Sequence, residues 1–231
     1  MLIISIITKA PIVPPLAQLP AFRHSPIVHT PEFHQLLPEL WAWQSYDSAV
    51  KADLFSSAIR TSAGIYIVDP IALPEADLRR LSEGAPVAGI IVTNANHPRA
   101  SSTYSDRFSV PIFGEAQSFP DLKPARFAEA KKGAPIGGAL EVIEIEGAVA
   151  GEIALYHASN GGTLIVGDTL INFEPYGFSF LPRKYCLNEK QMRNSLQQLL
   201  ARPAERLLFA HGTPILSGAG QRLQQLLGQN H

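Results

Sequence analysis

Short apolar segments separated by polar turns run through most of the chain, and two pairs of them have the pattern of β-hairpins. Residues 56–61 alternate weakly between polar and apolar positions, and residues 65–68 form an apolar run after a Ser-Ala-Gly turn. Residues 152–157 and 163–166 flank Asn-Gly-Gly, which is a strong hairpin signal. We therefore predict two antiparallel strand pairs, one in each half of the chain.

Other segments predict helices and buried strands. Residues 74–81 have acidic side chains early and basic side chains late, as the helix dipole favours. Residues 189–200 place their leucines on one helical face, and residues 218–227 predict a closing helix. The continuous apolar runs 87–92 and 206–209 are typical of buried strands. This order of elements predicts an α/β sandwich with mixed sheets inside and helices outside.

The first 38 residues differ from the rest because prolines interrupt them. Seven prolines fall in this segment and would break any long helix or strand. We predict an irregular proline-rich arm over residues 1–38, followed by a single domain over residues 39–231. The prolines are Pro11, Pro14, Pro15, Pro20, Pro26, Pro31 and Pro38.

Composition narrows the classes of function. The 231 residues are 46% hydrophobic and 17% charged with a formal net charge of -1, so the chain can bury a large core. A net charge this close to zero gives no indication of a basic surface that would bind nucleic acid or an acidic membrane. The single cysteine, Cys186, excludes an intrachain disulfide and fits a reducing compartment. With no long apolar segment, we expect a cytoplasmic protein that binds neither nucleic acid nor membrane. The composition does not indicate an oligomeric state.

A short polar turn after the run 87–92 has the most informative residues. Residues 93–99 read Thr-Asn-Ala-Asn-His-Pro-Arg, and later segments read Gly-Asp at 167–168 and His-Gly at 211–212. The order and spacing of these segments resemble the metallo-β-lactamase-fold superfamily, whose first loop reads Thr-His-x-His-x-Asp-His. Segments 67–70 and 147–156 are also similar to that family. The resemblance implies a four-layered αββα sandwich.

The resemblance also implies where metal ligands would stand. Family members bind two metals, usually zinc, iron or manganese, with seven ligands. In this chain the bridging aspartate corresponds to Asp168 and the last histidine to His211. At the other positions stand residues that are not the family's ligands: Asn94, Asn96, Pro98, Arg99 and Ala148.

The residue chemistry at these positions opposes metal binding. A zinc site usually needs at least three ligands drawn from His, Cys and carboxylate, and proline and alanine have no donor side chain. Arg99 is a permanent cation, and at an effective dielectric of ~20 two unit charges about 4 Å apart interact by roughly 4 kcal/mol. We therefore expect no cofactor. The favoured prediction is a hydrolase homologue with a degenerate metal site, a pseudoenzyme that is inactive or binds a small-molecule ligand.

A hypothesis for the lost metals accompanies this prediction. Arg99 would form an ion pair with Asp168, because a buried carboxylate needs a partner and the guanidinium fork suits it. Asn94 and Asn96 would fill the former histidine positions as hydrogen-bonding partners.

Three alternatives stay open. His97, Asp168 and His211 could hold one zinc, iron or manganese ion and make a mononuclear metal-dependent hydrolase. Asn94 and Asn96 could instead join Asp168 around a harder ion. A protein-interaction scaffold that uses the outer helices or the arm is the third alternative. Candidate catalytic residues in an active enzyme are Asp168, His211 and His97.

Overall fold

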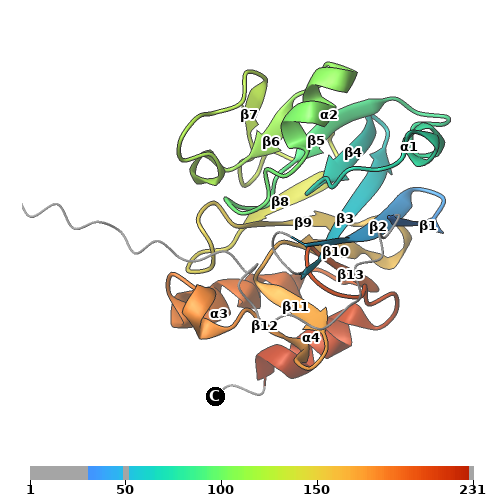
Figure 1. Ribbon diagram of the computed structural model, residues 1–231. Helices are drawn as coiled ribbons and strands as arrows, with labels where there is room; N and C mark the ends of the chain where they lie inside the picture. The colour runs from blue at the N-terminus through green and yellow to red at the C-terminus, as the bar shows by residue number, and fades with distance from the viewer. Residues whose placement is uncertain (1–30, 49–51, 229–231) are drawn as a thin grey trace, which may run out of the picture.

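The computed structural model describes residues 31–48 and 52–228. Two β-sheets pack face to face, and helices cover the outer face of each sheet (Figure 1). The predicted four-layered αββα sandwich is confirmed. In Figure 1, α1 (Glu75–Leu81) and α2 (Ser101–Phe108) cover one sheet, while α3 (Glu189–Leu196) and α4 (Ala219–Gly228) cover the other.

The first sheet has seven strands whose order in space follows their order in the sequence. The first four strands pair antiparallel, and the last four pair parallel, with α1 and α2 in crossovers between parallel neighbours. The hairpin predicted at 56–68 is formed by the third and fourth strands. The strands are β1 (Glu32–Leu37), β2 (Leu40–Asp47), β3 (Ala52–Thr61), β4 (Gly64–Val68), β5 (Val87–Ile91), β6 (Ile112–Gly114) and β7 (Phe127–Glu129).

The second sheet has four strands in the order β13-β10-β9-β8. The predicted hairpin of residues 152–166 is formed by β9 and β10, and β13 lies parallel to β10 on its other side. A separate two-stranded sheet, β11 with β12, was not predicted. The bounds are β8 (Leu140–Glu144), β9 (Ile153–His157), β10 (Thr163–Val166), β11 (Leu170–Phe173), β12 (Gly177–Phe180) and β13 (Arg206–Phe209).

The helices are short and have local reasons for where they begin. The side chain of Asn188 accepts a hydrogen bond from the backbone N–H of Gln191 at 3.1 Å and so caps α3. Within residues 31–48 and 52–228 no helix has the length and apolarity needed to cross a membrane. The described residues also contain four short 3-10 helices, at Ala116–Ser118, Ser159–Gly161, Arg183–Tyr185 and Gln197–Ala201.

Three buried clusters explain the four layers. One cluster lies between the sheets and joins Ile59 and Ile91 of the first sheet to Leu155 of the second. A second lies between the first sheet and α1 with α2, and a third between the second sheet and α3 with α4. Because both faces of each sheet are buried, the central strands read as continuous apolar runs.

The predicted boundary of the arm differs from the structure. Residues 32–37 form β1, which pairs antiparallel with β2 and so belongs to the first sheet. The prolines at 31 and 38 flank this strand instead of interrupting it, as is typical of an edge strand. Residues 1–30 of the predicted arm lie outside the described residues.

The turn after β13 depends on a glycine. Gly212 has φ +118°, and a Cβ there would overlap the Asn172 backbone of β11. Asn172 N–H donates to the carbonyl of His211 at 3.2 Å, and Thr213 N–H donates to the carbonyl of Asn172 at 2.9 Å. This small ladder fixes the direction in which His211 leaves the sheet.

Replacing Gly212 by alanine should therefore destabilise the domain through both backbone strain and overlap. We expect Gly212→Ala to lower the free energy of unfolding by about 2–4 kcal/mol. Gly218→Ala is the matched control, because Gly218 also has positive φ, +62°, but no atom lies within 4 Å of its Cβ position; there we expect about 1–2 kcal/mol. Urea denaturation followed by circular dichroism measures both, and equal losses would contradict the overlap at Gly212.

Candidate metal centre

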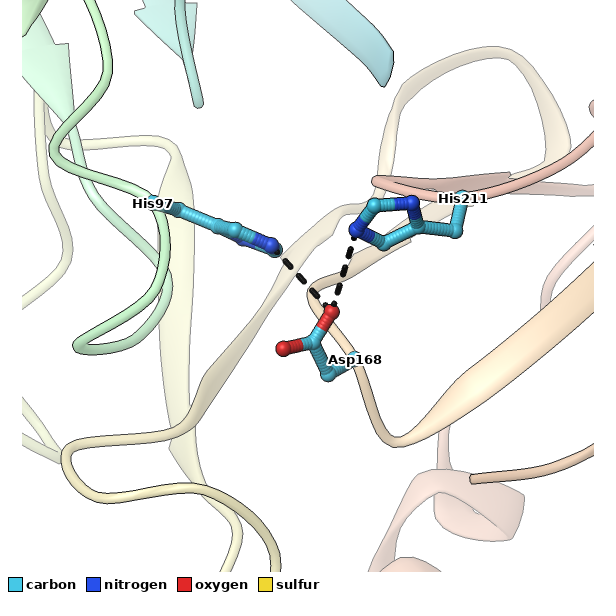
Figure 2. A group of neighbouring side chains, drawn as sticks. All are labelled: His97, Asp168 and His211. Atoms are coloured by element: carbon cyan, nitrogen blue, oxygen red, sulfur yellow. Dashed lines mark ion pairs between the residues drawn. The ribbon is translucent and has the colours of Figure 1, made fainter. Parts of the chain in front are cut away.

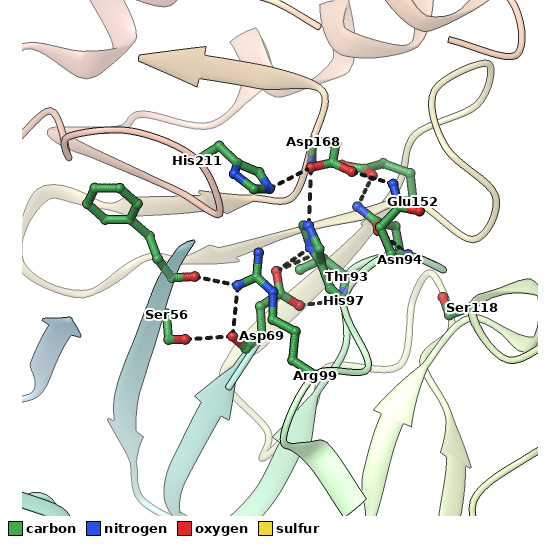
Figure 3. A network of polar contacts seen from close by, with 12 residues as sticks. Ser56, Asp69, Thr93, Asn94, His97, Arg99, Ser118, Glu152, Asp168 and His211 are labelled. Carbon is green, nitrogen blue, oxygen red and sulfur yellow. Dashed lines mark hydrogen bonds and ion pairs between the residues drawn. The ribbon is translucent and has the colours of Figure 1, made fainter. Parts of the chain in front are cut away.

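Four loops at the carboxyl ends of strands meet between the two sheets (Figure 3). Asp69 follows β4, and residues 93–99 follow its parallel neighbour β5. Asp168 follows β10, and His211 follows its parallel neighbour β13. Since the carboxyl ends of parallel neighbours meet at the same edge of a sheet, each sheet brings two loops to this place.

Backbone hydrogen bonds connect the two sheets here. The N–H of Ile153 in β9 donates to the carbonyl of Thr93 at 2.8 Å. The N–H of Phe55 in β3 donates to the carbonyl of Ala210 at 3.0 Å. The loops are thus positioned by main-chain contacts, which gives their side chains fixed directions.

His97, Asp168 and His211 form a buried cluster in which both imidazoles point at one carboxylate oxygen (Figure 2). Nε2 of His97 lies 3.2 Å from Oδ1 of Asp168, and Nε2 of His211 lies 3.4 Å from the same oxygen. His97 Nε2 and Asp168 Oδ1 have no hydrogen-bond partner among the described residues. One donor atom from each residue lies within 4.8 Å of the other two. The alternative ligand set of the sequence analysis is therefore assembled in space.

Both histidine rings are braced from behind. Nδ1 of His97 lies 2.9 Å from Oδ2 of Asp69 and 2.9 Å from Oγ1 of Thr93. Asp69 also accepts the backbone N–H of Thr93 at 2.8 Å and its hydroxyl at 2.6 Å. His211 has a hydrogen bond to the backbone of Asp53. A carboxylate or carbonyl behind a histidine fixes its tautomer and ring direction, which is typical of metal ligands.

The asparagines of the first loop are directed elsewhere. Asn94 donates from Nδ2 to Oε2 of Glu152 at 2.7 Å and accepts the N–H of Asn96 at 2.8 Å. Asn96 donates from Nδ2 to Oδ2 of Asp168 at 3.0 Å, so it presents an amide nitrogen and not an oxygen. Ala148 packs in the core beneath the second sheet. Asn94, Asn96 and Asp168 therefore do not present three oxygens to a hard ion.

The predicted ion pair between Arg99 and Asp168 is wrong for the part of the chain that the structure describes. Arg99 Nη1 instead donates to the carbonyls of Phe55 at 2.7 Å and of Asp69 at 3.1 Å. The groups against Asp168 are His97, His211 and the Asn96 amide. The imidazole of His97 occupies the place next to Asp168 that the prediction gave to the Arg99 guanidinium, because it lies between the Asp69 and Asp168 carboxylates (Figure 3).

The two carboxylates beside His97 raise the pKa of its imidazole strongly. Burial lowers the pKa of His97, but the negative charges of Asp168 and Asp69 raise it to about 9 against the opposing charge of Arg99. Burial also acts against the charged form of Asp168, yet the charge of His97 holds the pKa of this carboxyl well below its usual range. In the protein without metal, His97 is therefore an imidazolium at neutral pH.

The pKa values of Glu152 and His211 shift in the directions opposite to those of Asp168 and His97. Burial raises the pKa of Glu152 to about 8, and the negative charge of Asp168 adds to this effect. Burial lowers the pKa of His211 to about 3, because the attraction of Asp168 only partly offsets the loss of water. At neutral pH Glu152 is therefore protonated, and His211 is a neutral imidazole with a free lone pair on one nitrogen.

Comparison with known proteins identifies the family. The family model of the metallo-β-lactamase superfamily matches residues 34–229. This chain belongs to the metallo-β-lactamase superfamily. No protein of curated function matches it in sequence.

Solved structures of the superfamily have the same fold. A metallo-β-lactamase from Pontibacter korlensis has a TM-score of 0.65 and 17% identity over 87% of this chain and 100% of its own. A β-lactamase domain protein from Burkholderia ambifaria has a TM-score of 0.63 and 18% identity over 85% and 76%. Metallo-β-lactamase FIM-1 from Pseudomonas aeruginosa, solved in a mono-zinc form, has a TM-score of 0.65 and 14% identity over 87% and 94%. Identities this low establish the fold alone.

The residues present fit a single metal ion better than the two metals of the superfamily. Zinc holds nitrogen and oxygen ligands at about 2.0–2.2 Å, so neighbouring ligands of a tetrahedral site lie roughly 3.3–3.5 Å apart. The distances of 3.2 and 3.4 Å from Asp168 Oδ1 to the two Nε2 atoms are close to this spacing. Nε2 of His97 and Oδ1 of Asp168 have no hydrogen-bond partner among the described residues, so both atoms are available to an ion, although their opposite charges also draw them together.

Sequence reasoning did not find Glu152. Its Oε1 accepts the backbone N–H of Asp168 at 2.9 Å and of Thr169 at 3.3 Å, while its Oε2 accepts from Asn94. One carboxyl group thus holds the first loop and the Gly-Asp loop together. The only signal in the sequence was that Glu152 stands where the family pattern Gly-His-Thr-x-Gly-Ser has a serine.

Removal of the Glu152 side chain should loosen both loops. Glu152→Ala leaves three buried donors without an acceptor, and we expect it to lower the free energy of unfolding by about 2–4 kcal/mol. Glu146→Ala is the control, because Glu146 is an exposed glutamate in the preceding turn that accepts from Gln191; we expect a loss below about 1 kcal/mol there. Denaturant titration of the metal-free variants compares them. Similar losses for both would contradict the bridging role of Glu152.

Proposed function

We propose that this protein holds one divalent transition metal with His97, Asp168 and His211 and is a mononuclear metal-dependent hydrolase. The observation that supports the proposal is the convergence of three buried donor atoms, two of them without a hydrogen-bond partner among the described residues. Two imidazoles and one carboxylate also hold the catalytic zinc of some peptidases. A metal held there would polarise a carbonyl or phosphoryl oxygen and activate water for hydrolysis.

The other residues of the site have roles that do not depend on the metal's identity. Asp69 and Thr93 orient His97, and the Asp53 backbone orients His211. Glu152 sets the position of the Asp168 backbone. These contacts come from the chain itself, so they fix the directions of the ligand side chains.

The charges of the site support a second candidate, a metal-free ligand-binding protein. The carboxylates of Asp69 and Asp168 face two cations, His97 and Arg99, so the charges cancel without an ion. In this candidate the His97 imidazolium takes the part that the sequence analysis gave to Arg99. The metal and the proton compete for Nε2 of His97, so the two candidates exclude each other.

Metal content decides between the candidates. We expect about one equivalent of zinc, iron or manganese in protein purified without added metal or chelator, measured by elemental mass spectrometry. His97→Gln, Asp168→Asn and His211→Gln should each lose the metal, because two protein ligands do not hold it. His157→Gln is the control, since His157 is a buried histidine of β9 outside the site. Metal-free wild-type protein would overturn the proposal and favour the second candidate.

Hydrolysis is tested on the same preparations. The metal-loaded protein should cleave at least one member of a panel of ester, thioester, amide and phosphodiester substrates, and a chelator should abolish this activity. Loss of activity in Asp168→Asn with retention in His157→Gln would place the reaction at this site. Full activity after removal of the metal would contradict the proposal.

Asp69 should matter for metal affinity although it is not a ligand. Asp69→Asn weakens the brace on Nδ1 of His97, and we expect the dissociation constant for the metal to rise about 10- to 100-fold. Competition with a chromophoric chelator measures this change. Asp106→Asn is the control, because Asp106 of α2 forms an exposed ion pair with Arg126 and does not contact His97, Asp168 or His211 in any hydrogen bond or ion pair of the described residues. An unchanged affinity in Asp69→Asn would show that the brace is dispensable.

A further inference from the structure

The guanidinium of Arg99 has a donor that nothing in the described structure uses. Nη1 donates to the carbonyls of Phe55 and Asp69, whereas Nη2 is buried and has no hydrogen-bond partner among the described residues. Figure 3 shows this second nitrogen on the side of the guanidinium that faces His211 and Asp168. A buried N–H group without an acceptor costs about 1–3 kcal/mol, and more when the group is charged.

Three carboxylates act on the charge of Arg99, those of Asp69, Asp168 and Asp47. The Asp69 carboxylate accepts from Thr93 and faces His97, and Asp168 faces both histidines and accepts from Asn96. None of these carboxylates forms a hydrogen bond with Nη2. What would satisfy it is an acceptor that comes from outside the chain.

The backbone holds Arg99 in this position at a cost. Arg99 has φ +40° and Asp69 has φ +49°. Aspartate adopts this left-handed region readily, whereas for a long side chain such as arginine it is uncommon and carries strain. Both residues belong to the same network, since Arg99 donates to the Asp69 carbonyl. The loop thus uses strained backbone to keep a cation directed at the site, where a mere surface arginine would turn to solvent.

We propose that Arg99 forms an oxyanion subsite beside the His97, Asp168 and His211 cluster, and that the protein's ligand is a small molecule with a carboxylate or phosphoryl group. The flat guanidinium fork suits such groups and stays charged at every physiological pH. The proposal rests on the proposed function in one respect only, namely that the metal would be a second partner of the bound oxyanion. The Arg99 contact itself does not need the metal.

Isothermal titration with inorganic phosphate and with acetate tests this subsite. The measurement uses the full chain in two forms, one loaded with its metal and one stripped by a chelator and dialysed. We expect one of the two oxyanions to bind at a single site. The preference between phosphate and acetate distinguishes a phosphoryl from a carboxylate ligand. No binding of either oxyanion to folded wild-type protein in both forms would overturn the proposal.

Variants of Arg99 give the second readout. We expect Arg99→Met to weaken oxyanion binding roughly tenfold or more, because a charged hydrogen bond is lost, while metal content stays the same. Arg99→Lys should lie between the two, since it keeps the charge without the fork. Arg126→Met is the control, because Arg126 pairs with Asp106 on the surface. Equal affinity in wild type and folded Arg99→Met, or in wild type and Arg99→Lys if Arg99→Met does not fold, would overturn the subsite.

The two proposals fail in different ways. Oxyanion binding that depends on Arg99 in protein that never contains metal would sustain the subsite and overturn the mononuclear hydrolase. One equivalent of metal with oxyanion binding that ignores Arg99 would sustain the metal centre and overturn the subsite.

Discussion

The carboxylate of Asp168 is completely buried between the two sheets, and the rest of the site is arranged around its charge. A charge removed from water needs a partner of opposite sign or a metal ion, since the cost of leaving it alone is several kcal/mol. Two histidines and an asparagine amide surround it, and Glu152 holds its backbone. Either a proton on His97 or a metal between the three residues can supply the missing positive charge.

The first loop and the segment around Ala148 are joined by a side-chain hydrogen bond. The amide of Asn94 donates to Glu152, which follows Ala148 by four residues. This hydrogen bond fixes the first loop to the segment that follows Ala148.

Much of the fold could be predicted because it follows from local patterns. The Asn-Gly-Gly turn between β9 and β10, the apolar run of β5 and the cap on α3 each depend on neighbouring residues. Strand β1 could not be predicted from the sequence. Prolines 31 and 38 indicate interruptions of regular structure, unless it is known that β1 lies at the edge of the sheet. In the site, Asp168 and His211 were recognisable, whereas the bridging role of Glu152 depends on contacts with residues 16 and 58 positions away.

What the sequence determined by itself was the superfamily and a short list of residues that could form a site, among them His97, Asp168 and His211. Which of these residues meet was decided by the tertiary structure. His97 lies one position from the family's ligand register, and only the turn at residues 94–97, braced by Asp69, directs its ring at Asp168. From the sequence, Arg99 was the expected partner of Asp168, because a guanidinium suits a carboxylate. In space it lies behind His97 and donates to two backbone carbonyls, because directions of side chains follow from the fold and not from residue type.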